Sequence, residues 1–77
     1  RHGNYIWVRL LEAAQRSRDV SERAAEVEAT RFGVGASTNY EVTQARDSLT
    51  SARLSELRAI INYVNAVAEF ELVQYIG

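Results

Sequence analysis

The chain has 77 residues, of which 47% are hydrophobic, and its nine basic and ten acidic residues give a net charge of −1. This length allows one small domain or a piece of a larger one, and the near-neutral charge argues against a nucleic-acid partner, which needs a basic surface. Cysteine and proline are both missing, so disulfides and thiolate chemistry are excluded and no proline interrupts a helix over 4–32 or 39–76.

The first predicted element is a helix over about residues 5–32. Its strongest apolar line advances in alternating steps of three and four residues, the seven-residue repeat of coiled coils. A weaker line lies beside it, and Glu12–Arg16 and Asp19–Arg23 have the four-residue spacing of helix-supporting ion pairs. The strong line is Ile6, Leu10, Ala13, Ser17, Val20, Ala24 and Val27, and the weak line is Trp7, Leu11, Ala14, Ala25 and Phe32.

A turn is predicted next, over residues 33–38. Gly33 and Gly35 stand where the first helix must end, because glycine adopts the left-handed conformation of a helix C-terminus without a steric penalty. Thr38 and Glu41 have the spacing of a capping box, in which each side chain accepts a hydrogen bond from the other residue's backbone N–H. The sequence therefore predicts a sharp turn into a well-capped second helix.

The second helix is predicted over about residues 39–75. Three apolar lines run along it: Val42, Ala45, Leu49 and Ala52; then Leu54, Leu57, Ile61, Val64 and Ala68; and beside that Ile60, Tyr63, Val67 and Phe70. The last two lines are offset by one residue, or about 100° around the helix axis. A two-helix hairpin buries one such stripe and leaves the other in water, so the surplus stripe predicts a further neighbour.

These elements predict an all-α fold, a single long antiparallel hairpin of coiled-coil type that spans residues 1–77. The second neighbour leaves several arrangements open. A three- or four-helix bundle, a homodimer of hairpins, and a closed ring or sheet of helices would each supply it. Periodicity alone favours the bundle, which is the commonest of these arrangements.

The turn and the start of the second helix read R-F-x-V-G-x-S-T-N-Y-E-V and then x-Q-A. This pattern resembles the periplasmic hairpin tip of TolC-like outer-membrane efflux proteins. The similarity covers about residues 20–77, is weakest over 1–8, and fits the second of the family's two internal repeats slightly better than the first. The residues that carry it are Arg31, Phe32, Val34, Gly35, Ser37, Thr38, Asn39, Tyr40, Glu41, Val42, Gln44 and Ala45, followed by 52–54, 57–59, Tyr63, Ala66, Glu69 and Gly77.

The resemblance implies that the chain is a segment of a longer, trimeric protein of the Gram-negative cell envelope. The hairpin would be part of an α-helical barrel in the periplasm, the duct of an export or efflux channel, beside neighbouring helices of the same channel. Its tip would dock a periplasmic adaptor protein. The resemblance assigns that contact to Val34, Gly35, Ala36 and Ser37.

Two polar residues after the turn are implied to face the pore. Glu41 matches a position at which members of the family carry an acidic side chain toward the channel. Gln44 stands where some members carry a second acid. This difference argues against a strongly cation-selective constriction.

No catalytic constellation is present in the sequence: it has no nucleophile with a paired base and no phosphate-binding loop. His2, the single histidine, cannot form a metal site with scattered carboxylates. The longest mostly apolar stretch, 59–68, is shorter than the ~20 residues that span a bilayer. We therefore expect no enzymatic activity, cofactor, metal or membrane insertion by this segment. The alternative function is a self-associating antiparallel coiled-coil scaffold, or a helical-bundle interaction module, without a role in transport.

Overall fold

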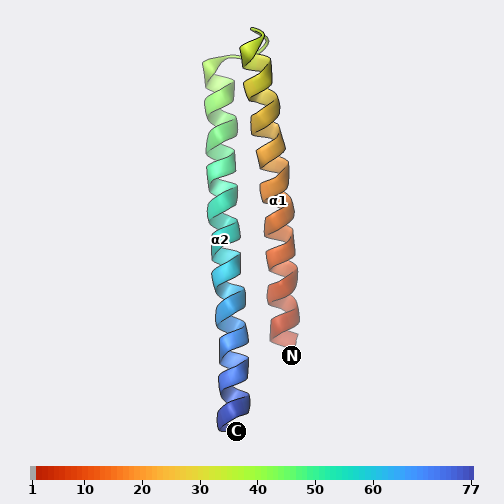
Figure 1. Ribbon diagram of the computed structural model, residues 1–77, viewed down its shortest axis with the longest axis vertical. Helices are drawn as coiled ribbons and strands as arrows, with labels where there is room; N and C mark the ends of the chain where they lie inside the picture. Colours follow the sequence, from red (N-terminus) through yellow and green to blue (C-terminus); the bar gives the residue numbers. More distant parts are fainter. Residues whose placement is uncertain (1) are drawn as a thin grey trace.

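The computed structural model describes residues 2–77, with side chains from Tyr5 onward, and these residues form a single helical hairpin (Figure 1). Helix α1 runs over His2–Gly33 and helix α2 over Asn39–Ile76. The two lie side by side and antiparallel in a rod of 62 × 14 × 11 Å. The predicted all-α hairpin is confirmed, and each predicted helix end lies within three residues of the observed one. Arg1 lies outside the described residues.

The two ends of the rod differ. At one end the chain turns between the helices, and we call this end the tip. At the other, the open end, α2 continues past the start of α1 (Figure 1). Over the described residues, neither helix has an apolar stretch long enough to cross a membrane.

The helices pack along faces that repeat every seven residues. The half-buried side chains of each helix follow steps of three and four, so they lie along one side of it. Val42 and Ala52, each 8% exposed, are the most deeply buried of the described side chains. The contact face comprises Trp7, Leu11, Ala14, Arg18, Ser21, Ala25 and Glu28 on α1, and Val42, Ala45, Leu49, Ala52, Glu56, Ala59, Tyr63, Ala66 and Phe70 on α2.

The stronger apolar line of α1 lies outside this contact. Its members precede the contact positions by one residue, which places them about 100° around the helix. The weaker line packs on α2 instead, and Arg18, which shares its register, pairs with Glu56. We call the exposed line the α1 outer stripe: Ile6, Leu10, Ala13, Ser17, Val20, Ala24 and Val27.

A second apolar line is exposed on α2, on the side that faces away from α1. Its large side chains, Leu54, Leu57, Ile61 and Val64, are between 48% and 54% exposed. Tyr63 and Phe70, by contrast, are half-buried on the contact face. The prediction that the hairpin buries one stripe of α2 and leaves another in water is confirmed. We call Leu54, Leu57, Ile61, Val64 and Ala68 the α2 outer stripe.

Candidate functional site

The tip begins with a Schellman motif that ends α1. The Ala36 N–H donates to the Arg31 carbonyl at 2.7 Å, and the Gly35 N–H donates to the Phe32 carbonyl at 3.1 Å. This pair of bonds requires a left-handed residue between them, and Gly35 has φ +77°. The predicted helix-ending glycine is therefore Gly35, whereas Gly33 is the last residue of α1 itself.

The predicted capping box at the start of α2 is confirmed. The Glu41 N–H donates to Thr38 Oγ1 at 3.1 Å, and the Thr38 N–H donates to Glu41 Oε1 at 3.0 Å. Thr38 itself is extended, with φ −106° and ψ 162°, as a residue that precedes a helix must be. Two backbone donors that the helix would leave unpaired are thus satisfied locally.

Side chains from both helices brace this turn. Glu28 accepts a hydrogen bond from the Ser37 hydroxyl at 2.5 Å and pairs with Arg31 at 3.1 Å. Arg31 also donates to the Ala36 carbonyl at 2.9 Å. The bracing role of Glu28 was not predicted from the sequence, although its three-residue spacing from Arg31 was a usable signal.

Hydrogen bonds hold Glu41 in its charged form. The backbone N–H of Thr38, then the hydroxyl of Thr38 and that of Ser37, lower the pKa of the Glu41 carboxyl below its ordinary value of 4.5. The Glu41 carboxylate therefore serves as a hydrogen-bond acceptor in the capping box, although the residue stays exposed to solvent. The side-chain amide of Gln44, one turn on, donates to Tyr40 Oη at 2.7 Å. That Glu41 and Gln44 face a pore stays a prediction.

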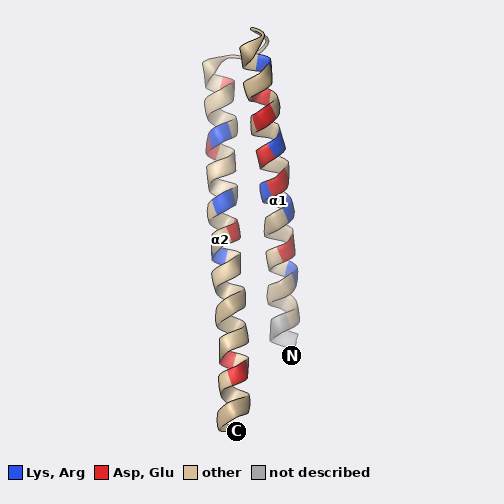
Figure 2. Ribbon diagram, viewed as in Figure 1, with Lys and Arg blue, Asp and Glu red and all other residues tan. Residues whose placement is uncertain are grey.

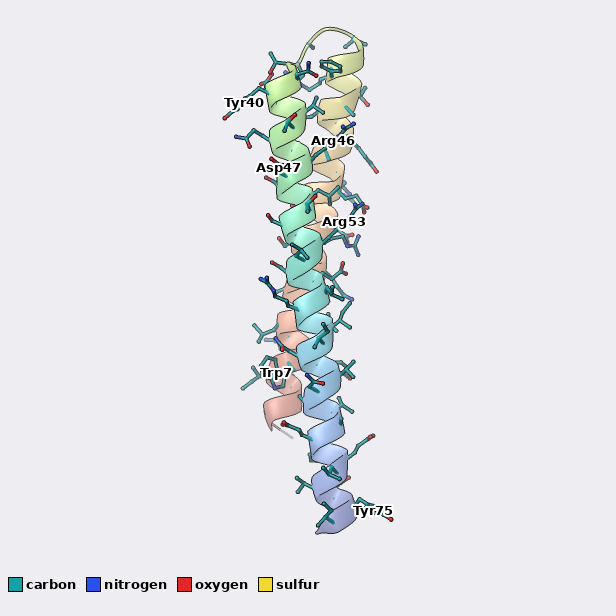
Figure 3. All side chains as sticks on the ribbon, turned by 90° about the vertical axis from the view of Figure 1, so that its left-hand side faces the viewer. Trp7, Tyr40, Arg46, Asp47, Arg53 and Tyr75 are labelled. Atoms are coloured by element: carbon teal, nitrogen blue, oxygen red, sulfur yellow. The ribbon has the colours of Figure 1, made fainter. Side chains whose placement is uncertain are left out.

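The four residues of the predicted adaptor contact do not present the same surface. Val34, 77% exposed, projects from the turn beside Gly35 and Ala36, which are also exposed. Ser37 is half-buried, and its hydroxyl lies within hydrogen-bond distance of both carboxylates, 2.5 Å from Glu28 and 3.2 Å from Glu41. The tip is thus a rigid frame with an apolar apex, and Figure 3 shows Tyr40 projecting from α2 close beside it.

Below the tip, the two broad sides of the hairpin differ in kind. On one side runs an open groove of ≈ 410 Å³ between the helices, lined by Ser17, Ser21, Asp47, Ser48, Ser51, Ala52 and Ser55. On the other side Arg53 of α2 pairs with Glu22 of α1 at 3.3 Å. Figure 2 shows the charged residues concentrated between the tip and the middle of the rod.

The ion pairs form at positions other than those the sequence indicated. Arg18 is their centre: it lies 3.0 Å from Glu56, 3.1 Å from Glu22 and 2.6 Å from Asp19. The hydrogen bond to Glu56 raises the Arg18 pKa. The predicted pairs Glu12–Arg16 and Asp19–Arg23 are not among the ion pairs of the described side chains, and Asp19 pairs with Arg18 instead.

Within the described residues, no group of three His, Asp or Glu side chains is placed to hold a metal ion. The His2 side chain lies outside them. Comparison of the chain with protein families, curated proteins and solved structures finds no match. The features that bear on function are therefore those of the hairpin itself, its tip and its two outer stripes.

Proposed function

We propose that this hairpin is a wall segment of the periplasmic duct of an outer-membrane export or efflux channel, and that its tip docks a periplasmic adaptor. The duct would be an α-helical barrel in a trimeric parent protein of the Gram-negative envelope. In that setting each helix has a neighbour on both sides. The residues that resemble TolC-like proteins, 31–45, are those that build the braced turn.

One observation carries this proposal: α2 is apolar on two opposite sides. Val42 and Ala52 pack on α1, while Leu57 and Ile61 face away from it and lie about half exposed. Exposed apolar surface of this extent on a soluble helix is typical of an interaction surface. A helix in a wall has this pattern because it is contacted from left and right.

The polar residues limit which sides of the hairpin a neighbour can cover. On the groove side, α2 contributes a continuous polar line, Ser48, Ser51, Ser55, Arg58, Asn62, Asn65 and Glu69, all exposed. On the ion-pair side, α1 contributes Glu12, Gln15, Asp19, Glu22 and Glu26. Stacking a second hairpin on the ion-pair side would bury its charged line, and burying unpaired charges is costly. The groove side also carries the α1 outer stripe, to which Ser17 belongs, so a scaffold of hairpins stacked on that side stays the alternative function.

The mechanism that follows is passive. Assembled hairpins would enclose a water-filled path, and an energised pump in the inner membrane would drive the substrate along it. The tip is suited to hold an adaptor, because its hydrogen-bonded frame keeps Val34 exposed at a fixed position. Preorganisation of this kind lowers the entropic cost of docking.

A complementation experiment tests the proposal. The gene that encodes this chain is deleted in its host and restored as wild type, as Val34→Asp, or as the control Gln15→Asp, which adds the same charge at an exposed helical position. We expect deletion to raise ethidium accumulation, and wild type and Gln15→Asp to reverse it. Val34→Asp should fail at an equal level of protein in the outer membrane. Full export by Val34→Asp would contradict the role of the tip, and unchanged accumulation on deletion would contradict a role in drug efflux.

A further inference from the structure

Helix α1 carries two apolar lines, and the line that packs on α2 is the less apolar of the two. Each residue of the α1 outer stripe precedes a residue of the contact face by one position, as Ser17 precedes Arg18. A turn of α1 by about 100° about its axis, with a shift of about 1.5 Å, would therefore place the outer stripe against α2. The stripe has no charged residue, whereas the contact face includes Arg18 and Glu28. Burial of apolar surface alone thus favours an arrangement that the hairpin does not adopt.

A network of charged side chains joins the two helices at the observed face. The Arg18 guanidinium meets the Glu56 carboxylate as a fork, in which Nε donates to Oε1 at 3.0 Å and Nη2 donates to Oε2 at 3.3 Å. Arg18 Nη1 lies 3.1 Å from Glu22 Oε1, and the other oxygen of Glu22 accepts a hydrogen bond from Arg53 of α2 at 3.3 Å. A two-point contact between a guanidinium and a carboxylate fixes orientation as well as distance.

The centre of this network lies inside the interface. The side chains of Arg18 and Glu56 are only 26% and 18% exposed. If α1 turned by about 100°, Ser17 would take the place of Arg18, and Glu56 would stay at the interface without a cation. A largely buried carboxylate that loses its partner is strongly unfavourable. The ion pair therefore opposes the rotation that apolar burial favours.

The turn is the other feature that can set the rotation of α1. Glu28 lies on the same contact face, and its carboxylate accepts a hydrogen bond from the Ser37 hydroxyl at 2.5 Å. This bond acts at the end of the helix, about 15 Å from Arg18 along the axis. Among the described side chains of the α1 contact face, Arg18 is the one that bonds to α2 itself. The two contributions can therefore be separated by mutation.

We propose that the network around Arg18 selects which apolar line of α1 packs on α2, and so keeps the α1 outer stripe on the outside of the hairpin. Arg18 and Glu56 are positioning residues, because their pairing favours one rotation of α1 and the other rotation leaves a charge unpaired. The ion pair acts by selection against an alternative arrangement. This inference goes beyond the proposed function, since it concerns pairing within one chain and is independent of which neighbour covers the stripe.

Intramolecular disulfides report which line of α1 faces α2, and the chain contains no cysteine of its own. The contact-face pair is Ala14→Cys with Ala59→Cys, and the outer-stripe pair is Ala13→Cys with Ala59→Cys. Because a disulfide needs Cβ atoms that point toward each other, we expect the contact-face pair to oxidise about tenfold faster while the network is intact. Both rates are followed at micromolar protein concentration by mass spectrometry, after alkylation of the remaining thiols.

Breaking the network should reverse the order of the two rates. Arg18→Glu sets a carboxylate against Glu56 and Glu22, so the outer-stripe pair should become the faster one. Arg18→Glu combined with Glu56→Arg should restore the original order. Arg16→Glu makes the same change of charge at an exposed position of α1, and it should leave the order unchanged.

Glu56→Leu is a second variant that keeps the test decisive if Arg18→Glu fails to fold. It makes the contact face of α2 more apolar, which favours a folded hairpin, yet it removes the partner of Arg18. We expect the outer-stripe pair to be the faster one in this variant too. Circular dichroism checks the helicity of every variant before oxidation.

Three results would overturn the inference. If the contact-face pair stays faster in both Arg18→Glu and Glu56→Leu, the turn sets the rotation of α1 without the network. If neither pair oxidises in Glu56→Leu, the ion pair holds the helices together and does not choose between faces. If Arg16→Glu reverses the order as well, the effect belongs to the charge of α1 as a whole. None of these measurements depends on export, so the proposed function can fail without this inference.

Discussion

The tip half of the hairpin, residues 18–56, and the open half, residues 5–17 with 57–76, are held together in different ways. Every side-chain hydrogen bond and ion pair found among the described side chains joins residues of the tip half, including the bridges Arg18–Glu56 and Arg53–Glu22. The two buried side chains, Val42 and Ala52, also lie there. The open half packs through half-buried apolar groups such as Leu11, Tyr63 and Phe70.

This contrast concerns how the two helices are joined. The tip half holds the two buried side chains and the side-chain bonds between the helices, although Val20 and Leu54 of its outer stripes are exposed. The open half exposes Leu57, Ile61 and Val64 at about half of their surface, and no side-chain hydrogen bond or ion pair joins its helices among the described side chains. The following variants test this division, from the largest expected effect to the smallest.

The largest effect should come from a charge placed in the core of the tip half. Val42→Asp should lower the free energy of unfolding by about 3 kcal/mol, because Val42 is 8% exposed and a carboxylate there has no partner. Val64→Asp, in the outer stripe, should change it by less than about 0.5 kcal/mol in a dilute monomer. Urea unfolding followed by circular dichroism measures both. Equal losses would remove the distinction between the two halves.

The two glycines of the tip should respond with opposite signs. Gly35→Ala should destabilise the hairpin by about 1.5 kcal/mol, because φ +77° is unfavourable for a residue with a Cβ. Gly33→Ala should stabilise it by about 0.5 kcal/mol, because Gly33 is helical and an added Cβ meets nothing within 4 Å. Thermal unfolding of the two variants in parallel gives the comparison. A gain for Gly35→Ala would show that the left-handed turn is not maintained in solution.

Loss of the N-terminal cap should have a somewhat smaller effect. Thr38→Ala removes the acceptor of the Glu41 N–H and should cost about 1 kcal/mol of stability. Thr43→Ala, on the same helix but exposed and past the cap, is the matched control and should be neutral or slightly stabilising. Hydrogen exchange at the Glu41 amide should accelerate in the first variant alone. Identical exchange in both would contradict the capping box.

The smallest effect is a dependence of stability on pH. Because folding lowers the pKa of Glu41 from its usual 4.5, the unfolded chain binds the proton more tightly. The stability from this group is present above pH 4.5 and is lost as the pH falls through the folded pKa. Glu41→Gln keeps a cap acceptor but does not titrate. Melting temperatures at pH 7 and pH 3 should therefore differ less for this variant than for wild type, and an equal difference would assign the effect to other carboxylates.

The tip could be predicted from sequence because its rules are local. Thr38 and Glu41 are three residues apart, and Gly35 needs no information from the rest of the chain to end a helix. The bracing by Glu28 was missed because it depends on how the turn brings Ser37 back toward α1. A local sequence pattern predicts a contact reliably only where the two residues in contact are also close in sequence.

The contact face of α1 could not be chosen from its own periodicity. Hydropathy ranks Ile6, Leu10 and Val20 above the line that contains Arg18, yet Arg18 is the residue that lies inward. Its partner there is Glu56, which is 38 positions away in sequence. The hydropathy pattern of one helix shows how apolar each of its stripes is, but it does not show which neighbour will cover that stripe.

The braced turn also sets an order of assembly. Its hydrogen bonds join residues no more than nine positions apart, so closing it costs little chain entropy, whereas bringing residue 6 beside residue 68 encloses most of the chain. Folding should begin at the turn, and the pairing of the two helices should then extend from the turn toward the termini. A force applied to the two termini would undo it in the reverse sequence, and the turn would be the last part to yield.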